Sequence, residues 1–402
     1  MMNRRLFLKS GLAASGLLTG LSDWSFADTN STALSLNNRN GPFIVVFLRG
    51  GADGLGILSP LDDPLFLAAR PPDMRFAIDK AANTKPLVLD TGRFYWHPAA
   101  APLDQLMNRQ RLLAWQAVGI KDETRSHFEA QELIERGTQS LQNLSDPFGW
   151  MARQVYLNKA KLSSSPASLP LFAGNNNMPN AMMGADQVLA MRDLQNGVSF
   201  PGGLAGLKAL QAMSEADGEH PAAKIILNTF DTLEQVNTAL PKTDNKVLPY
   251  DSSGSTPYPN SDPGVGLRSV ARLVQAQVGL QYAWVDHSSW DTHEGQGWRI
   301  NNLISQLSSA LLAFDEDMQA KNQPYTLVVL TEFGRRLISN KSNGTDHGHG
   351  SLALVMGNKV PGGKMMGRWP GLDTSNLDRG VDLAATSDCL AVLKQAQTWH
   401  QS

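Results

Sequence analysis

The segment that most constrains the fold is residues 325–357, in which two apolar runs flank a polar loop. The runs Tyr325–Thr331 and Ser351–Met356 have the continuous apolar character of strands that are covered on both faces. The loop between them carries carboxylate and imidazole side chains, namely Glu332, Asp346, His347 and His349. Such side chains directly after a buried strand are typical of a metal site at the carboxyl edge of an α/β sheet. The segment therefore predicts an α/β fold with metal ligands at its strand ends.

Similar apolar runs recur along the chain and alternate with helical patterns. The other predicted strands are residues 43–48, 112–118, 169–173 and 278–285. Amphipathic helices are predicted at residues 97–107, 124–134, 266–276 and 300–320. Strand–helix–strand order implies parallel strands that are joined by right-handed crossovers.

Residues 1–27 have the features of an export signal rather than of a folded element. Asn3-Arg-Arg-Leu-Phe-Leu-Lys9 contains the paired arginines, apolar pair and lysine of a twin-arginine signal, and Ser25-Phe-Ala27 is a small-x-small cleavage site. We expect the twin-arginine machinery to export the protein to the periplasm or beyond, with residues 28–402 as one mature domain. The alternatives are a retained segment that anchors the protein in the membrane and a basic N-terminus that arose by chance.

Composition narrows the range of partners. A formal net charge of −2 over 402 residues gives no reason to expect nucleic acid or an anionic membrane as partner. No internal run of 18 apolar residues exists, so no membrane span is expected in the mature protein. The single cysteine, Cys389, lies in an apolar pattern and is expected in the core. Residues 187–262 are helical and then rich in Pro, Ser, Asn and Asp, which predicts an insertion over one face of the domain.

Candidate metal ligands gather in the loops that follow the predicted strands. Five of the eight histidines fall in three such loops: His127, His287, His293, His347 and His349. Four acids occupy equivalent places: Asp53, Asp291, Glu332 and Asp346. Asp291 and His293 are two residues apart, so in an extended loop both side chains point to one side and can share an ion. Each residue alone could be structural, and Asp53 fits a turn as well as a ligand. Together the set predicts one or two divalent ions, and ligands without thiolate suit Zn, Mn, Fe or Mg.

Ser126 stands at the predicted start of a helix, with Glu129 three residues further on. It fits a simple helix cap. It also fits a nucleophile, because the N-terminus of a helix favours an alkoxide and an incoming anion. Arg49, Arg125 and Arg335 each lie beside a candidate ligand. They could hold an anionic substrate such as a phosphate or sulfate ester, or form surface salt bridges instead.

Five motifs, taken together with the twin-arginine start, resemble a known family. The motifs are Phe47–Gly54, Arg125–Gln131, Trp290–Gln296, Glu332–Arg335 and Gly344–His349. They look like the exported proteins of the domain-of-unknown-function family 1501 and cover almost the whole mature chain in the same order. That family is similar in fold to the alkaline phosphatase and sulfatase superfamily. The resemblance implies a three-layer α/β/α sandwich with a mixed, mostly parallel central sheet and one or two metals at its carboxyl edge.

The resemblance also implies roles for individual residues. Asp53 takes the place of the superfamily's first metal-binding aspartate, and Ser126 falls where the nucleophile lies. Asp291 and His293 resemble the ligand pair of the second metal, which His349 completes.

Three places depart from the pattern that the resemblance implies: Ala52 stands where an asparagine is expected before Asp53, Ser288 and Ser289 replace two glycines before Trp290, and the third place follows Glu332. Glu332 stands where an Asp–His dipeptide ends its strand, but Phe333 replaces the histidine. His127, Asp346 or His347 would therefore have to compensate.

Two functions follow from the resemblance. The first is a metal-dependent hydrolase of phosphate or sulfate esters, in which either Ser126 or a metal-activated water attacks. The second is a non-catalytic exported protein that keeps the fold for binding or surface assembly, and fold alone does not choose between them.

Overall fold

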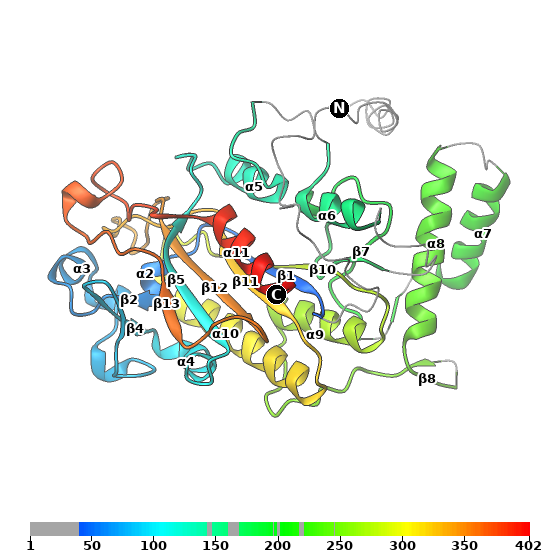
Figure 1. Cartoon of the computed structure of the whole chain (residues 1–402), viewed down its shortest axis with the longest axis horizontal. Coiled ribbons are helices and arrows are strands. Elements are labelled where there is room, and N and C mark those ends of the chain that lie inside the picture. The colour runs from blue at the N-terminus through cyan, green and yellow to red at the C-terminus, as the bar shows by residue number, and fades with distance from the viewer. Residues whose placement is uncertain are drawn as a thin grey trace.

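The computed structural model describes residues 40–142, 147–159, 169–195, 197–198, 202–216, 221–244 and 246–402. The predicted export signal, residues 1–27, lies outside these described residues. A nine-stranded sheet forms the centre of the molecule (Figure 1). In spatial order its strands are β13 (Lys364–Met366), β5 (Leu112–Gly119), β12 (Ser351–Gly357), β11 (Thr326–Thr331), β1 (Phe43–Leu48), β10 (Tyr282–His287), β6 (Leu171–Ala173) and β7 (Val188–Ala190), with β14 (Ser387–Asp388) beside β5.

The central strands are buried on both faces, as their continuous apolar runs predict. Every residue of β1, β11 and β12 is buried, and alternate residues of β1 point into two separate hydrophobic cores. Strand β1 pairs in parallel with β10 and β11, and the parallel pairing continues to β6 and β7. Strand β12 is antiparallel to both β11 and β5. The expected mixed, mostly parallel sheet is confirmed.

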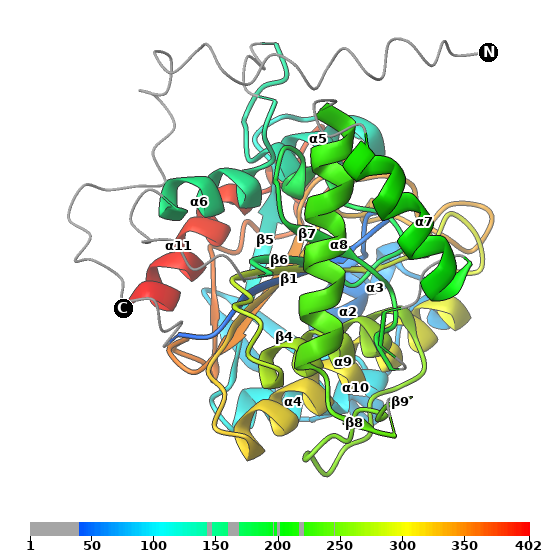
Figure 2. The same cartoon turned by 90° about the vertical axis from the view of Figure 1, so that its right-hand side faces the viewer.

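Helices cover both faces of the sheet and make three layers (Figures 1 and 2). The core on one face includes α4 (Ala101–Asn108), α9 (Asp262–Gln275) and α10 (Gln296–Ala320). The core on the other face includes α5 (His127–Arg136), α6 (Trp150–Lys159) and α11 (Cys389–Gln401). The α/β/α sandwich expected from the sequence is therefore confirmed, and Cys389 is buried in its core as predicted.

Smaller elements surround this sandwich. The small elements that follow β1 in the sequence are α2 (Gly54–Ile57), α3 (Pro64–Ala69), β2 (Leu58–Ser59), β3 (Leu87–Leu89) and β4 (Gly92–Trp96). The region expected to be an insertion contains β7, which pairs with the central sheet, and then α7 (Gly203–Ala216), α8 (Pro221–Ala239), β8 (Lys242–Thr243) and β9 (Lys246–Val247). Helices α7 and α8 stand beside the sheet rather than on its faces (Figure 1). Short 3-10 turns are η1 (Pro72–Met74), η2 (Ile78–Lys80), η3 (Pro98–Ala100), η4 (Asn180–Met182) and η5 (Thr374–Asn376).

The strand register brings several loops to one edge of the sheet. Leu48 at the end of β1 is level with His287 of β10 and Thr331 of β11. Because β12 is antiparallel to β11, the loop that enters β12 lies at this same edge. Strand β5 is antiparallel to β12 in turn, so the loop from β5 to α5 also begins there. The loops that carry the candidate ligands are thus neighbours.

Within the described residues, no helix combines the length and apolarity that crossing a membrane requires.

The stability of the fold is expected to fall in mild acid because one histidine is buried and two are partly buried. Burial lowers the pKa of His97, His287 and His400 to about 4 each, whereas an unfolded histidine titrates near 6.5. Between these values the unfolded chain binds protons that the folded chain does not, so the free energy of unfolding decreases as the pH falls from about 6.5 to about 4. Urea unfolding across this range measures the slope. Replacing His287 with glutamine should reduce the slope, and an unchanged slope would contradict this explanation.

Candidate metal centre

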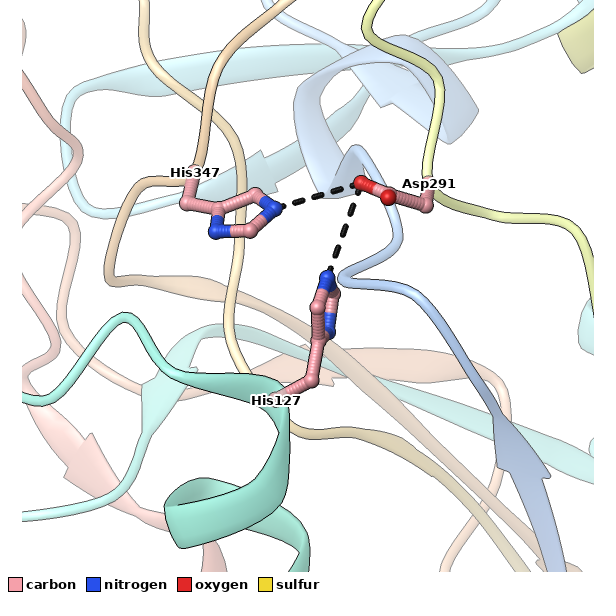
Figure 3. Close-up of side chains that lie close together, drawn as sticks. All are labelled: His127, Asp291 and His347. Atoms are coloured by element: carbon pink, nitrogen blue, oxygen red, sulfur yellow. Dashed lines mark hydrogen bonds and ion pairs between the residues drawn. The ribbon is translucent and has the colours of Figure 1, made fainter.

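Three loops at the carboxyl edge of the sheet bring three imidazoles and a carboxylate together, and Figure 3 draws two of these imidazoles, His127 and His347, with Asp291. The Asp291 carboxylate lies at the centre of the group. Its Oδ1 atom is 3.0 Å from Nε2 of His293, 3.2 Å from Nε2 of His347 and 3.6 Å from Nε2 of His127. His127 opens α5, Asp291 and His293 follow β10, and His347 precedes β12. The Asp291 side chain is 45% exposed, so the cluster opens to solvent.

Each imidazole is held through its other ring nitrogen, Nδ1. The partners are Glu332 Oε1 for His127 at 2.8 Å, Asp346 Oδ1 for His293 at 3.3 Å, and the Arg125 carbonyl for His347 at 2.8 Å. A carbonyl oxygen can only accept, so His347 donates from Nδ1 and is left with a lone pair on Nε2. In neutral rings the same arrangement at the two carboxylates leaves a lone pair on each of the three Nε2 atoms, which lie 3.0 to 3.6 Å from Asp291 Oδ1. Hydrogen bonds of this kind orient imidazoles as metal ligands in known sites.

The distances between the inner nitrogens favour a cation at the centre. Nε2 of His293 lies 3.0 Å from Nε2 of His347. Two lone pairs at this distance repel each other unless a proton or another cation lies between them. Among the residues that the structure describes, buried Nε2 of His127 has no hydrogen-bond partner. An ion bound to Asp291 and these imidazoles would satisfy all three nitrogens.

The pKa values follow the charges around the cluster. Burial acts to raise the pKa of the Asp291 carboxyl. The hydrogen bond and positive charge of Arg335 outweigh this effect, so the pKa falls to about 2. The hydrogen bond to Glu332 raises the pKa of His127. Burial lowers the pKa of His347, which favours the neutral ring that a metal ligand requires. Asp291 is therefore anionic at neutral pH.

Phe333 forms an aromatic support for two of the imidazoles. Its ring centroid lies 4.8 Å from the rings of both His127 and His347. Phe333 thus packs against both histidines, whose own ring centroids lie 4.4 Å apart. Gly51 makes room for this ring, because a Cβ atom there would lie 2.5 Å from Phe333 Cε2.

The donor set fits a divalent transition ion. The ligand atoms of His127, Asp291 and His347 all lie within 4.8 Å of one another, and His293 adds a third imidazole. Three nitrogens with one carboxylate suit Zn, Mn or Fe, whereas Mg prefers oxygen ligands throughout. The fit is to a single ion, because the ligands share one centre.

Arg335 joins the loops that carry these ligands. Its side chain is 0% exposed. It donates to the carbonyls of Gly51 at 2.6 Å, Thr345 at 2.8 Å, Trp290 at 3.1 Å and Gly50, and to Asp291 Oδ1 at 2.6 Å. One guanidinium thus forms hydrogen bonds with the loop after β1, the loop after β10 and the loop before β12.

Two predicted ligands lie outside the cluster and have other partners. Asp53 Oδ2 is 2.5 Å from both Arg70 Nη1 and Gln296 Nε2. His349 has Nε2 2.9 Å from the Ile120 carbonyl and Nδ1 2.8 Å from Asp378 Oδ2. Glu332 and Asp346 contact the cluster from outside, through Nδ1 of His127 and His293.

The predicted catalytic residues are near cluster residues in the sequence. They differ in whether their side chains already have hydrogen-bond or ion-pair partners. Ser126 is the N-cap of α5, next to His127, and its hydroxyl makes no capping hydrogen bond. The Arg125 guanidinium is bound to Asp378 and Asp382. The donors of the Arg335 guanidinium are occupied by the hydrogen bonds described above.

Arg49 also has partners of its own. It pairs with Glu135 at 2.9 Å and with Asp286 at 2.8 Å.

Three residues near the site were not predicted from the sequence. Gln296 closes the motif Trp290–Gln296 and could have been noticed there. Arg70 lies in a segment without any motif, so no local signal pointed to it. Arg336 follows Arg335 directly and is half-exposed.

Removing the guanidinium of Arg335 should destabilise the fold strongly. Arg335→Met leaves several buried carbonyls without a donor, and we expect a loss of about 3 kcal/mol or more in the free energy of unfolding. Arg379→Met is the control, because this exposed arginine pairs only with Glu123 at the surface and should cost less than about 1 kcal/mol. Urea unfolding measures both. Equal small losses would show that Arg335 does not join the loops.

Comparisons with known proteins bear on the fold and the family. No curated protein matches the sequence. The fold is similar to a protein in the alkaline phosphatase superfamily from Vibrio parahaemolyticus, with 11% identity and a TM-score of 0.34 over 81% of this chain and 62% of that one. It is similar to the C-terminal periplasmic domain of EcEptC from Escherichia coli in complex with Zn, with 10% identity and a TM-score of 0.35 over 80% of this chain and 75% of that one. It is also similar to Ps i-CgsB in complex with k-i-k-neocarrahexaose, with 10% identity and a TM-score of 0.35 over 90% of this chain and 74% of that one.

This chain thus spans 62% of the length of the Vibrio protein, which is less than two thirds. Residues 222–398 match the model of the family described as "Protein of unknown function (DUF1501)". That match confirms, for this part of the chain, the resemblance to the DUF1501 family that the motifs carry.

Proposed function

We propose that the protein is an exported, metal-dependent hydrolase of phosphate or sulfate esters. The observation that carries the metal dependence is the convergence of three imidazole Nε2 atoms on Asp291 Oδ1. The ester class rests on the resemblance of the motifs to the alkaline phosphatase and sulfatase superfamily. The proposal of export, to the periplasm or beyond, rests on the twin-arginine pattern in residues 1–27.

His127, Asp291, His293 and His347 would hold the ion. When bound, a divalent ion supplies Lewis-acid stabilisation of the negative charge that builds on the ester oxygens in the transition state. Glu332 and Asp346 fix the orientation of His127 and His293 through hydrogen bonds to Nδ1. The exposure of Asp291 leaves one side of the cluster open to a substrate.

Ser126 is the candidate nucleophile. Its place at the N-terminus of α5 puts the hydroxyl in the positive field of the helix. The hydroxyl makes no capping hydrogen bond, so attack would not break one. In this version Ser126 Oγ bonds to the phosphorus or sulfur, the alcohol leaves, and water later releases the inorganic anion. In the other version water attacks directly and Ser126 serves only to position it.

Arg336 is the guanidinium best placed to bind the anionic group of the ester. Its main chain is fixed, because its amide donates to the Asp346 carbonyl at 3.0 Å and its carbonyl accepts from Arg70 at 3.0 Å. The neighbouring pair Arg335 and His347 forms an antiparallel bridge, which sets Arg336 beside the cluster. Its side chain is 47% exposed and approaches an acid, Asp382, only at 3.9 Å. Arg125 and Arg335, in contrast, have their donors occupied.

Metal content and ester hydrolysis test the proposal together. The mature protein should contain Zn, Mn or Fe and hydrolyse an aryl phosphate, phosphodiester or sulfate, and chelation should abolish both properties.

Asp291→Asn should lower the metal affinity by 100-fold or more, because it removes the anionic ligand at the centre. Ser126→Ala should lower kcat by about 1000-fold or more if the serine attacks, and much less if water does. Metal binding without hydrolysis of any ester would favour the non-catalytic binding role.

Kinetics of Arg336 variants test the anion contact. Arg336→Ala should raise KM for the ester about tenfold, because a charge-assisted hydrogen bond is lost, and should leave the metal content unchanged. Arg336→Lys should keep part of the affinity, since the charge remains but the fork is lost. Arg93→Ala is the matched control, because Arg93, which lies on β4, is 57% exposed and pairs with Asp62. An unchanged KM in Arg336→Ala would remove this residue from the substrate site.

A further inference from the structure

The sequence left open whether the chain takes one ion or two, and the contacts of Asp53 bear on that choice. Asp53 stands at the N-cap of α2, just after β1, and is 2% exposed. Both of its carboxylate oxygens are engaged. Oδ2 accepts from Arg70 Nη1 and Gln296 Nε2 at 2.5 Å each, and Oδ1 is 3.2 Å from Arg70 Nη2.

The guanidinium of Arg70 is held as firmly from its other side. Its side chain is 0% exposed. Nε donates to the Leu337 carbonyl at 2.6 Å and Nη2 to the Arg336 carbonyl at 3.0 Å. A cation that displaced this guanidinium from Asp53 would leave a buried, unpaired charge, which is strongly unfavourable.

The space around Asp53 is also filled. A Cβ atom at Gly56 would lie 2.9 Å from Asp53 Oδ2. Gln296, which donates to the same oxygen, accepts in turn from Thr292 at 2.8 Å and from Thr345 at 2.5 Å. Within the described residues, the carboxylate therefore has three donors and a guanidinium that compensates its charge.

We infer that this chain binds a single divalent ion, at Asp291 and the three imidazoles, and that the Arg70 guanidinium permanently occupies the cation position beside Asp53. This inference rests on the proposed function and concerns how many ions that function uses. Asp53 and Arg70 act as positioning residues, because their network reaches two of the three ligand-bearing loops. Thr292 lies between Asp291 and His293, and Thr345 lies two residues before His347.

The network also sets the ligand loops in place without an ion. Arg70 joins the carbonyls of residues 336 and 337 to Asp53, and Gln296 joins Asp53 to Thr292 and Thr345. These hydrogen bonds involve no metal ligand. The metal-free protein should therefore keep its loops ordered.

Metal stoichiometry tests the inference directly. The full mature chain is stripped with chelator and reloaded with Zn²⁺ or Mn²⁺, and bound metal per chain is measured by elemental analysis and native mass spectrometry. The wild type should bind one ion per chain. The double variant Asp53→Asn/Arg70→Gln, which removes both charges and keeps hydrogen-bonding groups, should also bind one ion, with an affinity within about tenfold of the wild type. Asp291→Asn is the matched control and should lose the ion.

Each result decides something. Two ions per chain in the wild type, or loss of the ion from a double variant whose circular dichroism is native, would overturn the single-ion inference while sparing the hydrolase proposal. Binding of no ion by the wild type would sink both. If the double variant does not fold, the wild-type stoichiometry decides by itself. As a further readout, hydrogen exchange in residues 288–296 and 335–347 should be similar in metal-free and loaded protein, and extensive loosening without metal would contradict the role of the network.

Discussion

The buried guanidinium of Arg335 is the interaction on which the candidate site depends. A fully buried cation must find acceptors, and here they are main-chain carbonyls from separate loops together with Asp291. Two of the acceptors belong to Gly50 and Gly51, whose positive φ angles of 119° and 71° turn their carbonyls toward it. The same group therefore fixes the geometry of three loops and holds Asp291 as an anion. Because the strand register already sets these loops side by side, one side chain is enough to join them.

Charge in this region is balanced in two different ways. At Asp53, one carboxylate meets one guanidinium in a closed and buried pair. At the cluster, Asp291 pairs with the engaged guanidinium of Arg335, Glu332 and Asp346 face imidazoles, and the site is open to water. The excess of negative charge favours a divalent cation there and not at Asp53. In the proposed function, the half-exposed Arg336 would offer a positive charge to an anion that approaches from solvent.

Much of the fold could be predicted from the sequence, because buried strands leave continuous apolar runs. The runs at residues 43–48, 112–118, 278–285 and 325–331 became central strands, and their ends do carry the candidate ligands. The local spacing of Asp291 and His293 also pointed to a shared centre. What the sequence could not reveal is which candidate ligands already have other partners in the folded chain. Asp53 and His349 have the same local setting as Asp291, and only the folded chain brings Arg70 to the first and Asp378 to the second.

The ligands of the cluster come from distant segments of the chain, the start of α5, the loop after β10 and the loop before β12. No short piece of the unfolded chain carries them all, so tight binding must wait until the sheet has formed. Selection among Zn, Mn and Fe depends on which ion is available as well as on intrinsic affinity. If the chain crosses the membrane already folded, as the proposed twin-arginine route implies, the identity of the proposed metal would be decided in the compartment where the chain folds and not where it works.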